Sequence, residues 1–106
     1  MIKVNEISIN TSTLGDGTHS TAIDFTSISN VLADDYFYIT LDGSEKALNA
    51  SSNMAVSSFM DIVKDACNAD SGLSSKAIFT SNSNILTIVT RDSNSIAIDI
   101  DYHRDE

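Results

Sequence analysis

One stretch of the sequence repeats its apolar residues with the period of an α-helix, and it constrains the fold more than any other feature. From about residue 53 to 68 the spacing of three and four places these side chains on one stripe: Val56, Phe59, Met60, Val63, Ala66 and Cys67. Ser52 and Asn53 are good N-cap residues, and the segment NADSG ends the pattern. Burying each large apolar side chain contributes about 1.5 to 3 kcal/mol. The stripe therefore predicts one amphipathic helix packed on a sheet.

Most of the remaining sequence alternates apolar and polar residues, as strands do, between short polar turns. Strands are expected at 1–10, 21–28, 36–41, around 47–48, and at 76–80, 85–90 and 96–102. Asp16-Gly17 and Asp42-Gly43 are signals for two-residue type I′ hairpin turns. Ser, Thr and Asn make up 35 of the 106 residues, a composition that favours short strands and many turns.

The apolar patterns of two of these strands predict further details of the sheet. The first changes its apolar parity, which predicts a bulge near Asn5 and Glu6. Segment 85–90 is apolar on both parities, which predicts a central strand covered on both faces. We expect 85–90 to be the middle strand of a meander formed by the last three strands.

The elements together predict an α+β fold with mainly antiparallel strands. About six strands span nearly 30 Å, whereas a helix is about 10 Å across, so one helix covers only around half of such a sheet. The rest is covered when the sheet curls on itself or when a second subunit packs on it, and we expect both. We expect a strongly bent five- or six-stranded sheet or small barrel with one helix at about 53–68. In element count this resembles the Sm-like and SH3-like small barrels, and that resemblance implies rings formed through edge strands and RNA binding.

Residues 10–21 form an unusually polar hairpin, in which Leu14 is the only strongly apolar residue. We interpret this segment as a polar arm on a single domain that spans residues 1–106. The chain has about the length of one compact domain with one core.

Charge and cysteine content disfavour several functions. The formal net charge is -9, from 15 acidic and 6 basic residues, and the basic residues are spread along the chain. Nucleic acid and anionic membranes are therefore unfavourable partners. Cys67 is the single cysteine, the segment MIKVNEIS lacks the features of a secretory signal, and no apolar run is long enough to span a bilayer. We expect a cytoplasmic protein, or a virion component if the protein is viral.

Tyr36, Tyr38 and Thr40 form the outer row of the clearest strand. An aromatic row can stack bases or contact a protein, and the negative charge favours protein contact. We interpret these three residues, together with the exposed Leu14, as interface residues.

Asp99, Asp101 and His103 occupy one parity of the last strand. Two carboxylates and an imidazole could bind a divalent metal, although such sites usually draw further ligands from elsewhere. The alternative is a solvated strand face whose charges discourage edge pairing, and this reading is favoured.

No residue stands out as catalytic, and no cofactor is expected. Asp61 and Asp65 are one helical turn apart, as solvated acids often are, and Cys67 lies on the apolar stripe, where a thiol is inert. The sequence contains no phosphate-binding, zinc or nucleophile-elbow motif. We therefore expect a non-enzymatic structural or assembly protein, for example a viral head or tail component, that forms homo-oligomers or contacts other proteins. The alternative is an Sm-like RNA-binding protein.

Overall fold

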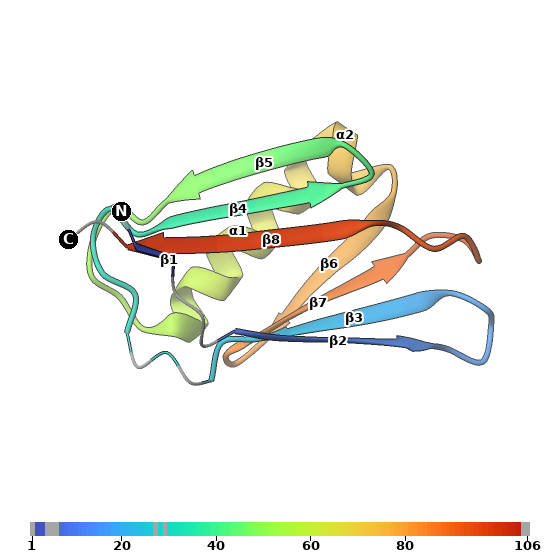
Figure 1. The fold of residues 1–106 in the computed structure, drawn as a ribbon, viewed down its shortest axis with the longest axis horizontal. Helices are drawn as coiled ribbons and strands as arrows, with labels where there is room; N and C mark the ends of the chain where they lie inside the picture. The colour runs from blue at the N-terminus through green and yellow to red at the C-terminus, as the bar shows by residue number, and fades with distance from the viewer. Residues whose placement is uncertain (1, 4–6, 27, 29, 105–106) are drawn as a thin grey trace.

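The computed structural model describes residues 2–3, 7–26, 28 and 30–104. Its strands are β1 (Ile2–Lys3), β2 (Ser8–Thr13), β3 (His19–Asp24), β4 (Tyr36–Leu41), β5 (Ser44–Asn49), β6 (Ala77–Asn82), β7 (Ile85–Thr90) and β8 (Ile98–Arg104), and its helices are α1 (Val56–Ala69) and α2 (Ser71–Ser74). In this part of the chain the strands form two antiparallel sheets: sheet A in the order β1-β8-β4-β5 and sheet B in the order β2-β3-β7-β6 (Figure 1). The predicted α+β class with antiparallel strands is confirmed.

The predicted helix is α1, which begins three residues later than expected. It buries five residues of the expected stripe, and Ala66 is half-buried; the five are Val56, Phe59, Met60, Val63 and Cys67. The predicted N-cap is wrong. Ala55 occupies the N-cap position and makes no side-chain cap bond. The Asn53 side chain instead accepts a hydrogen bond from the Ala33 amide at 2.8 Å, so it fixes the loop before β4 rather than the start of the helix.

The expectation of a single bent sheet or small barrel is corrected by the division into two sheets. Strands β6 and β7 form the predicted hairpin, but residues 91–97 then carry the chain across to sheet A. In sheet A, β8 lies between β1 and β4 and does not pair with β7. The predicted three-strand meander is therefore wrong for its last strand. The register of β8 on β4 agrees with its apolar parity, because Ile100 and Tyr102 pair with Ile39 and Phe37, which are buried on the same face of the sheet.

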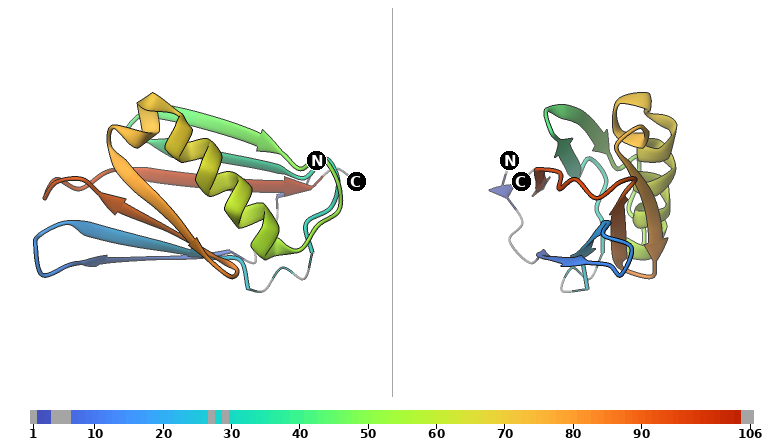
Figure 2. Two further views of the ribbon diagram at one scale, coloured as in Figure 1. Left: turned by 180° about the vertical axis from the view of Figure 1, so that it is seen from behind. Right: turned by 90° about the vertical axis from the view of Figure 1, so that its right-hand side faces the viewer.

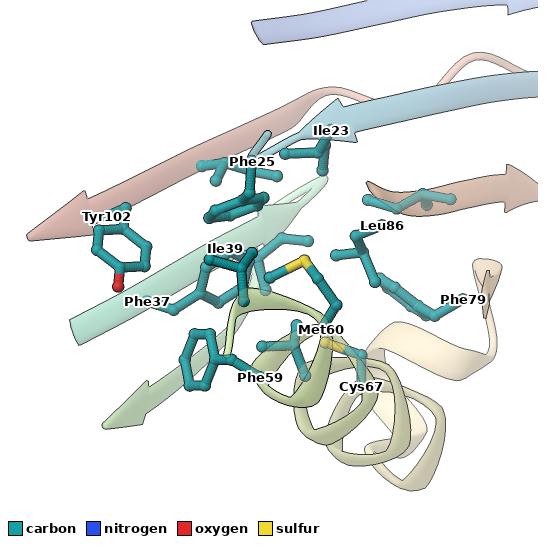
Figure 3. Close-up of a cluster of buried hydrophobic side chains, with 14 of the residues drawn as sticks. Ile23, Phe25, Phe37, Ile39, Phe59, Met60, Cys67, Phe79, Leu86 and Tyr102 are labelled. Atoms are coloured by element: carbon teal, nitrogen blue, oxygen red, sulfur yellow. The ribbon is translucent and has the colours of Figure 1, made fainter. Parts of the chain in front are cut away.

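The two sheets and α1 enclose one core. Figure 3 shows side chains from all three layers in contact: Phe37 and Ile39 from sheet A, Met60 and Cys67 from α1, and Phe79 and Leu86 from sheet B. Helix α1 lies behind sheet A in Figure 1 and in front of it in the reversed view of Figure 2. One face of each sheet is therefore covered by other elements of the same chain. A second subunit is therefore not needed to bury this core, and further cover by a second subunit stays a prediction.

Strand β7 is central in sheet B, as predicted, but its two faces differ. Leu86 and Ile88 are fully buried, whereas Ile85 and Val89 on the opposite face are half-buried. The described residues therefore cover β7 completely on one face only.

The polar hairpin predicted at 10–21 is the β2–β3 pair. All six residues of β2 are exposed, whereas β3 also pairs with β7 and buries Thr21. Strand β2 is therefore the exposed outer strand of this hairpin. The turn between β2 and β3 is a three-residue connection, not the expected two-residue type I′ turn. The Leu14 amide donates a hydrogen bond to the Thr18 carbonyl, and within the turn only Gly17 has a positive φ, of 89°. The bulge expected near Asn5 and Glu6 lies outside the described residues.

The second glycine turn is as predicted. Asp42 and Gly43 have φ of 46° and 87°, the type I′ conformation, and they connect β4 to a full six-residue β5. Because this turn matches the twist of the strands, β4 and β5 pair without interruption from Tyr36–Asn49 to Leu41–Ser44.

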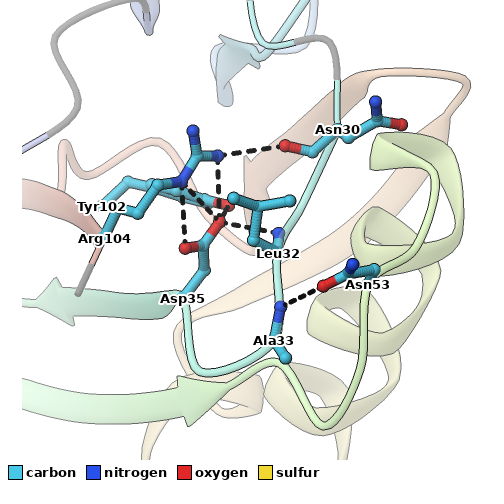
Figure 4. Close-up of polar contacts among 7 residues, drawn as sticks. All are labelled: Asn30, Leu32, Ala33, Asp35, Asn53, Tyr102 and Arg104. Atoms are coloured by element: carbon cyan, nitrogen blue, oxygen red, sulfur yellow. Dashed lines mark hydrogen bonds and ion pairs between the residues drawn. The ribbon is translucent and has the colours of Figure 1, made fainter. Parts of the chain in front are cut away.

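A buried carboxylate ties the loop before β4 to the end of β8 (Figure 4). Asp35 is fully buried and accepts hydrogen bonds from the Tyr102 hydroxyl at 2.5 Å, from the Leu32 amide at 2.9 Å and from Arg104 Nη2 at 3.0 Å. Burial alone would raise the pKa of Asp35, but the hydrogen bonds from Arg104, Tyr102 and Leu32, with the guanidinium charge, outweigh burial and lower the pKa. Burial, and then the bond to Asp35, raises the pKa of Tyr102. This cluster is fully paired and so stabilises the fold.

Candidate protein-interaction face

The two polar rows that the sequence singled out lie side by side on one face of sheet A. Because β4 and β8 pair in register, each residue of one row stands beside a residue of the other, and β5 adds a third column. The cross-strand rows are His103–Tyr36–Asn49, Asp101–Tyr38–Ala47 and Asp99–Thr40–Glu45. We call these nine residues the outer face of sheet A. It points away from α1, which lies on the other side of the sheet (Figures 1 and 2).

The aromatic residues of this face hold one another in place. The rings of Tyr36 and Tyr38 stack with centroids 6.4 Å apart and planes 15° apart, and the His103 ring lies 6.3 Å from Tyr36. The Tyr38 hydroxyl donates a hydrogen bond to Glu45 Oε2, and this bond raises the pKa of the Tyr38 hydroxyl. Both tyrosines are half-buried by these neighbours. The stacking and the hydrogen bond restrain the two tyrosine rings, and such restraint lowers the entropy cost of binding a partner.

The face is also negative. Asp99, Asp101 and Glu45 flank the tyrosines, and the nine residues include no lysine or arginine; the nearest cation in register is Lys3 of β1, which pairs with His103 at the edge of the sheet. A guanidinium or ammonium group can stack on a tyrosine ring while it pairs with a neighbouring carboxylate. A phosphate group would be repelled by the same carboxylates. The face thus has the chemistry to receive cationic side chains.

The side chains of Asp99, Asp101 and His103 do not converge on one position where a metal ion could bind. Alternate residues of a strand are about 6.6 Å apart, and among the described residues no three His, Cys, Asp or Glu side chains gather closely enough to hold a metal ion. The metal-site hypothesis thus gains no support from the geometry and stays a prediction.

The other residues named from the sequence lie elsewhere. Leu14 is 41% exposed but sits at the β2–β3 turn, at the opposite end of the long axis from the start of β4 (Figure 1). Asp61 accepts a hydrogen bond from Ser81 at 2.5 Å, whereas Asp65 is paired with Lys64 at 3.4 Å, so the two acids face different partners. Cys67 is fully buried, and burial raises the pKa of its thiol to about 12.

Sequence reasoning missed one polar hollow of about 210 Å³. It lies where the β4–β5 turn, the start of β6 and the loop after β7 meet, and its lining residues include Asp42, Lys76, Arg91 and Asp92. Arg91 Nε donates to the Ser74 carbonyl at 2.5 Å. Two cations far apart in sequence are thus brought together, but two carboxylates beside them balance their charge. No local sequence pattern signals this grouping.

Comparison with known proteins adds no family: no protein-family model matches the chain, and no curated protein matches it. Within the described residues, no helix is long and apolar enough to cross a membrane. The outer face of sheet A is therefore the candidate site.

Proposed function

We propose that this protein is a non-enzymatic structural or assembly protein that binds a basic segment of another protein on the outer face of sheet A. The observation that carries the proposal is the stacked pair Tyr36 and Tyr38 on a sheet face that α1 leaves open, with carboxylates on both sides. Tyrosine is enriched in protein interfaces, where its ring supplies contact area at low entropy cost.

The charge of the face indicates what kind of partner it binds. Two copies that met through this face would bring Asp99, Asp101 and Glu45 against the same residues of the other copy, which is unfavourable. A partner carrying arginine or lysine would pair with these carboxylates and stack on the tyrosines. The outer face of sheet A therefore fits a different protein better than a second copy.

RNA binding, the alternative function, receives less support. The tyrosine pair could stack two bases, as aromatic residues do in single-strand binders. Such binders surround their aromatic residues with cations, whereas this face surrounds them with acids. We keep RNA binding as one outcome of the test.

The test uses isotope-labelled protein and a short peptide of alternating arginine and threonine, followed by NMR at low salt. We expect the largest shifts at the amides of 36–40 and 99–103, and weaker binding at about 0.15 M salt, where the Debye length is about 8 Å. Replacing both tyrosines, Tyr36→Ser with Tyr38→Ser, should weaken binding about five- to thirty-fold, since each cation–π contact contributes about 0.5 to 1 kcal/mol.

Two variants of equal charge separate a local site from general attraction to an acidic protein. Asp99→Asn with Glu45→Gln removes two charges from the face, and Asp65→Asn with Asp92→Asn removes two exposed charges elsewhere. The first pair should weaken peptide binding and the second should not. Equal effects, or shifts spread over the whole surface, would refute the proposal. Tighter binding of single-stranded RNA than of the peptide at the same salt would favour the alternative.

A further inference from the structure

The edges of the two sheets differ in how they are protected against pairing with another strand. In sheet A, β5 carries the charged Glu45 and Lys46, and the described part of β1 is Ile2–Lys3. In sheet B, the edge of β6 is closed by α1: the Asn68 side chain donates to the Phe79 carbonyl at 2.9 Å and accepts from the Phe79 amide at 3.0 Å. Short length, charge and a covering helix are the usual means by which proteins keep edges unpaired.

Strand β2 has none of these protections. It runs for six residues, Ser8–Thr13, with no charge and no proline, and all six are exposed. Among the described strands it pairs with β3 alone. Three of its residues are β-branched, namely Ile9, Thr11 and Thr13, and such residues favour strand pairing. An edge with these properties is a template for another strand.

The hydrogen bonds of the hairpin show which backbone groups β2 offers. The Leu14 amide bonds the Thr18 carbonyl, and the His19 amide bonds Thr90 Oγ1 of β7, on the far side of β3 from β2. Because bonding direction alternates along antiparallel strands, Thr13, opposite His19, turns its amide and carbonyl away from β3. The same holds at every second residue, so Ile9, Thr11 and Thr13 offer a row of amides and carbonyls at the open edge.

We propose that β2 pairs with β2 of a second copy of this chain. The strands run antiparallel about a two-fold axis at Thr11, so that Ile9 of each copy faces Thr13 of the other. This register satisfies the open-edge backbone groups of all three β-branched residues in both copies. It joins the two copies of sheet B into one continuous sheet.

Charge is the reason to expect a second copy here. Two chains of net charge -9 repel each other, and like charges directly opposite one another in a sheet are destabilising. The six residues of β2 carry no charge, so the paired β2 strands themselves place no like charges opposite one another. Leu14, which follows β2 and is 41% exposed, would come opposite Ser8 of the other copy and lose part of its exposure.

The first test is cross-linking under mild oxidation. Residues of a hydrogen-bonded antiparallel pair have Cα atoms about 5.5 Å apart, which suits a disulfide. Thr11→Cys should therefore form a covalent dimer on a non-reducing gel. The control is Ser12→Cys, whose two copies would lie about 8 Å apart in this register, too far to bridge. The native Cys67 is buried and does not compete.

The second test exchanges charges at the facing positions, Ile9 and Thr13, which are exposed, so that the fold is retained. Ile9→Lys with Thr13→Glu places opposite charges face to face and should sediment as a dimer, like the parent protein. Ile9→Lys with Thr13→Lys places like charges face to face and should sediment as a monomer. Circular dichroism confirms that both variants fold.

Any other outcome overturns the inference. A monomeric parent protein at high micromolar concentration, equal cross-linking of Thr11→Cys and Ser12→Cys, or the same oligomeric state for both charge variants would each do so. The inference uses different residues from the proposed function, so the two fail separately. Tyr36→Ser with Tyr38→Ser should weaken peptide binding and leave the dimer intact, and a dimer lost in that variant would place self-association on sheet A instead.

Discussion

Removing the buried carboxylate of Asp35 should be among the most destabilising single changes in this protein. In Asp35→Ala, the Tyr102 hydroxyl and the Leu32 amide each lose their acceptor, and a buried polar group left unpaired costs about 1 to 3 kcal/mol. Arg104 loses its ion pair but keeps 25% of its side chain exposed, so water partly compensates for its charge. We expect a total loss of about 3 to 5 kcal/mol in the free energy of unfolding, the usual range when one partner of a buried pair is removed.

The assay is urea unfolding followed by far-ultraviolet circular dichroism. A loss of this size is a large part of the 5 to 15 kcal/mol that stabilises a typical domain, and it should lower the Tm by at least about 10 °C. The control is Asp65→Ala, in which the replaced side chain is 76% exposed, and which should change stability by no more than about 0.5 kcal/mol. If Asp35→Ala costs no more than this control, the account of the cluster is wrong.

The same cluster predicts a pH dependence. The pKa of Asp35 is lowered in the folded protein, so its contribution is present above the ordinary value of about 3.9 and is lost as the pH falls through the lower folded value. The pKa of Tyr102 is raised, so its contribution is present below about 10 and is lost as the pH rises further. Stability should therefore fall at both ends, and Asp35→Ala should lose stability less steeply in acid than the parent protein. Parallel acid curves would contradict this assignment.

Three further predictions concern Asn68, Cys67 and the row Asp99, Asp101 and His103. Asn68→Ala should cost about 1 to 3 kcal/mol, because the Phe79 amide and carbonyl lose their partners, whereas Asn49→Ala on the exposed face should cost little in the same urea titration. Cys67 should react with iodoacetamide far more slowly in the folded protein than in urea, because burial raises its pKa, and equal rates would show that α1 opens readily. Calorimetric titration with zinc or calcium should give no heat beyond dilution, and a saturable signal that Asp99→Asn abolishes would revive the metal-site hypothesis.

The candidate face was visible in the sequence as two separate rows. Tyr36 and Tyr38 were identified from the alternation of one strand, and Asp99 and His103 from another. That the two strands are neighbours was not predicted, because β8 was expected to pair with β7. The alternation of apolar and polar residues shows which face of a strand is exposed to solvent, but it does not show which strand is its neighbour in the sheet.

The local structure of this protein can be predicted from the amino-acid sequence alone. The helix, the strands and the type I′ turn at Asp42-Gly43 follow from side-chain period and from the φ angles that glycine and aspartate allow. These properties are local, so a single chain reveals them without a partner.

Long-range contacts set the division of the strands into two sheets, the burial of Asp35 and the open edge of β2. Each depends on groups far apart in the sequence: Tyr102 and Arg104 for Asp35, and Asn68 for the edge of β6. Backbone hydrogen bonds are the same for every residue type, so strand pairing carries little sequence signal of its own. Long-range packing of the core selects among the pairings that local patterns allow.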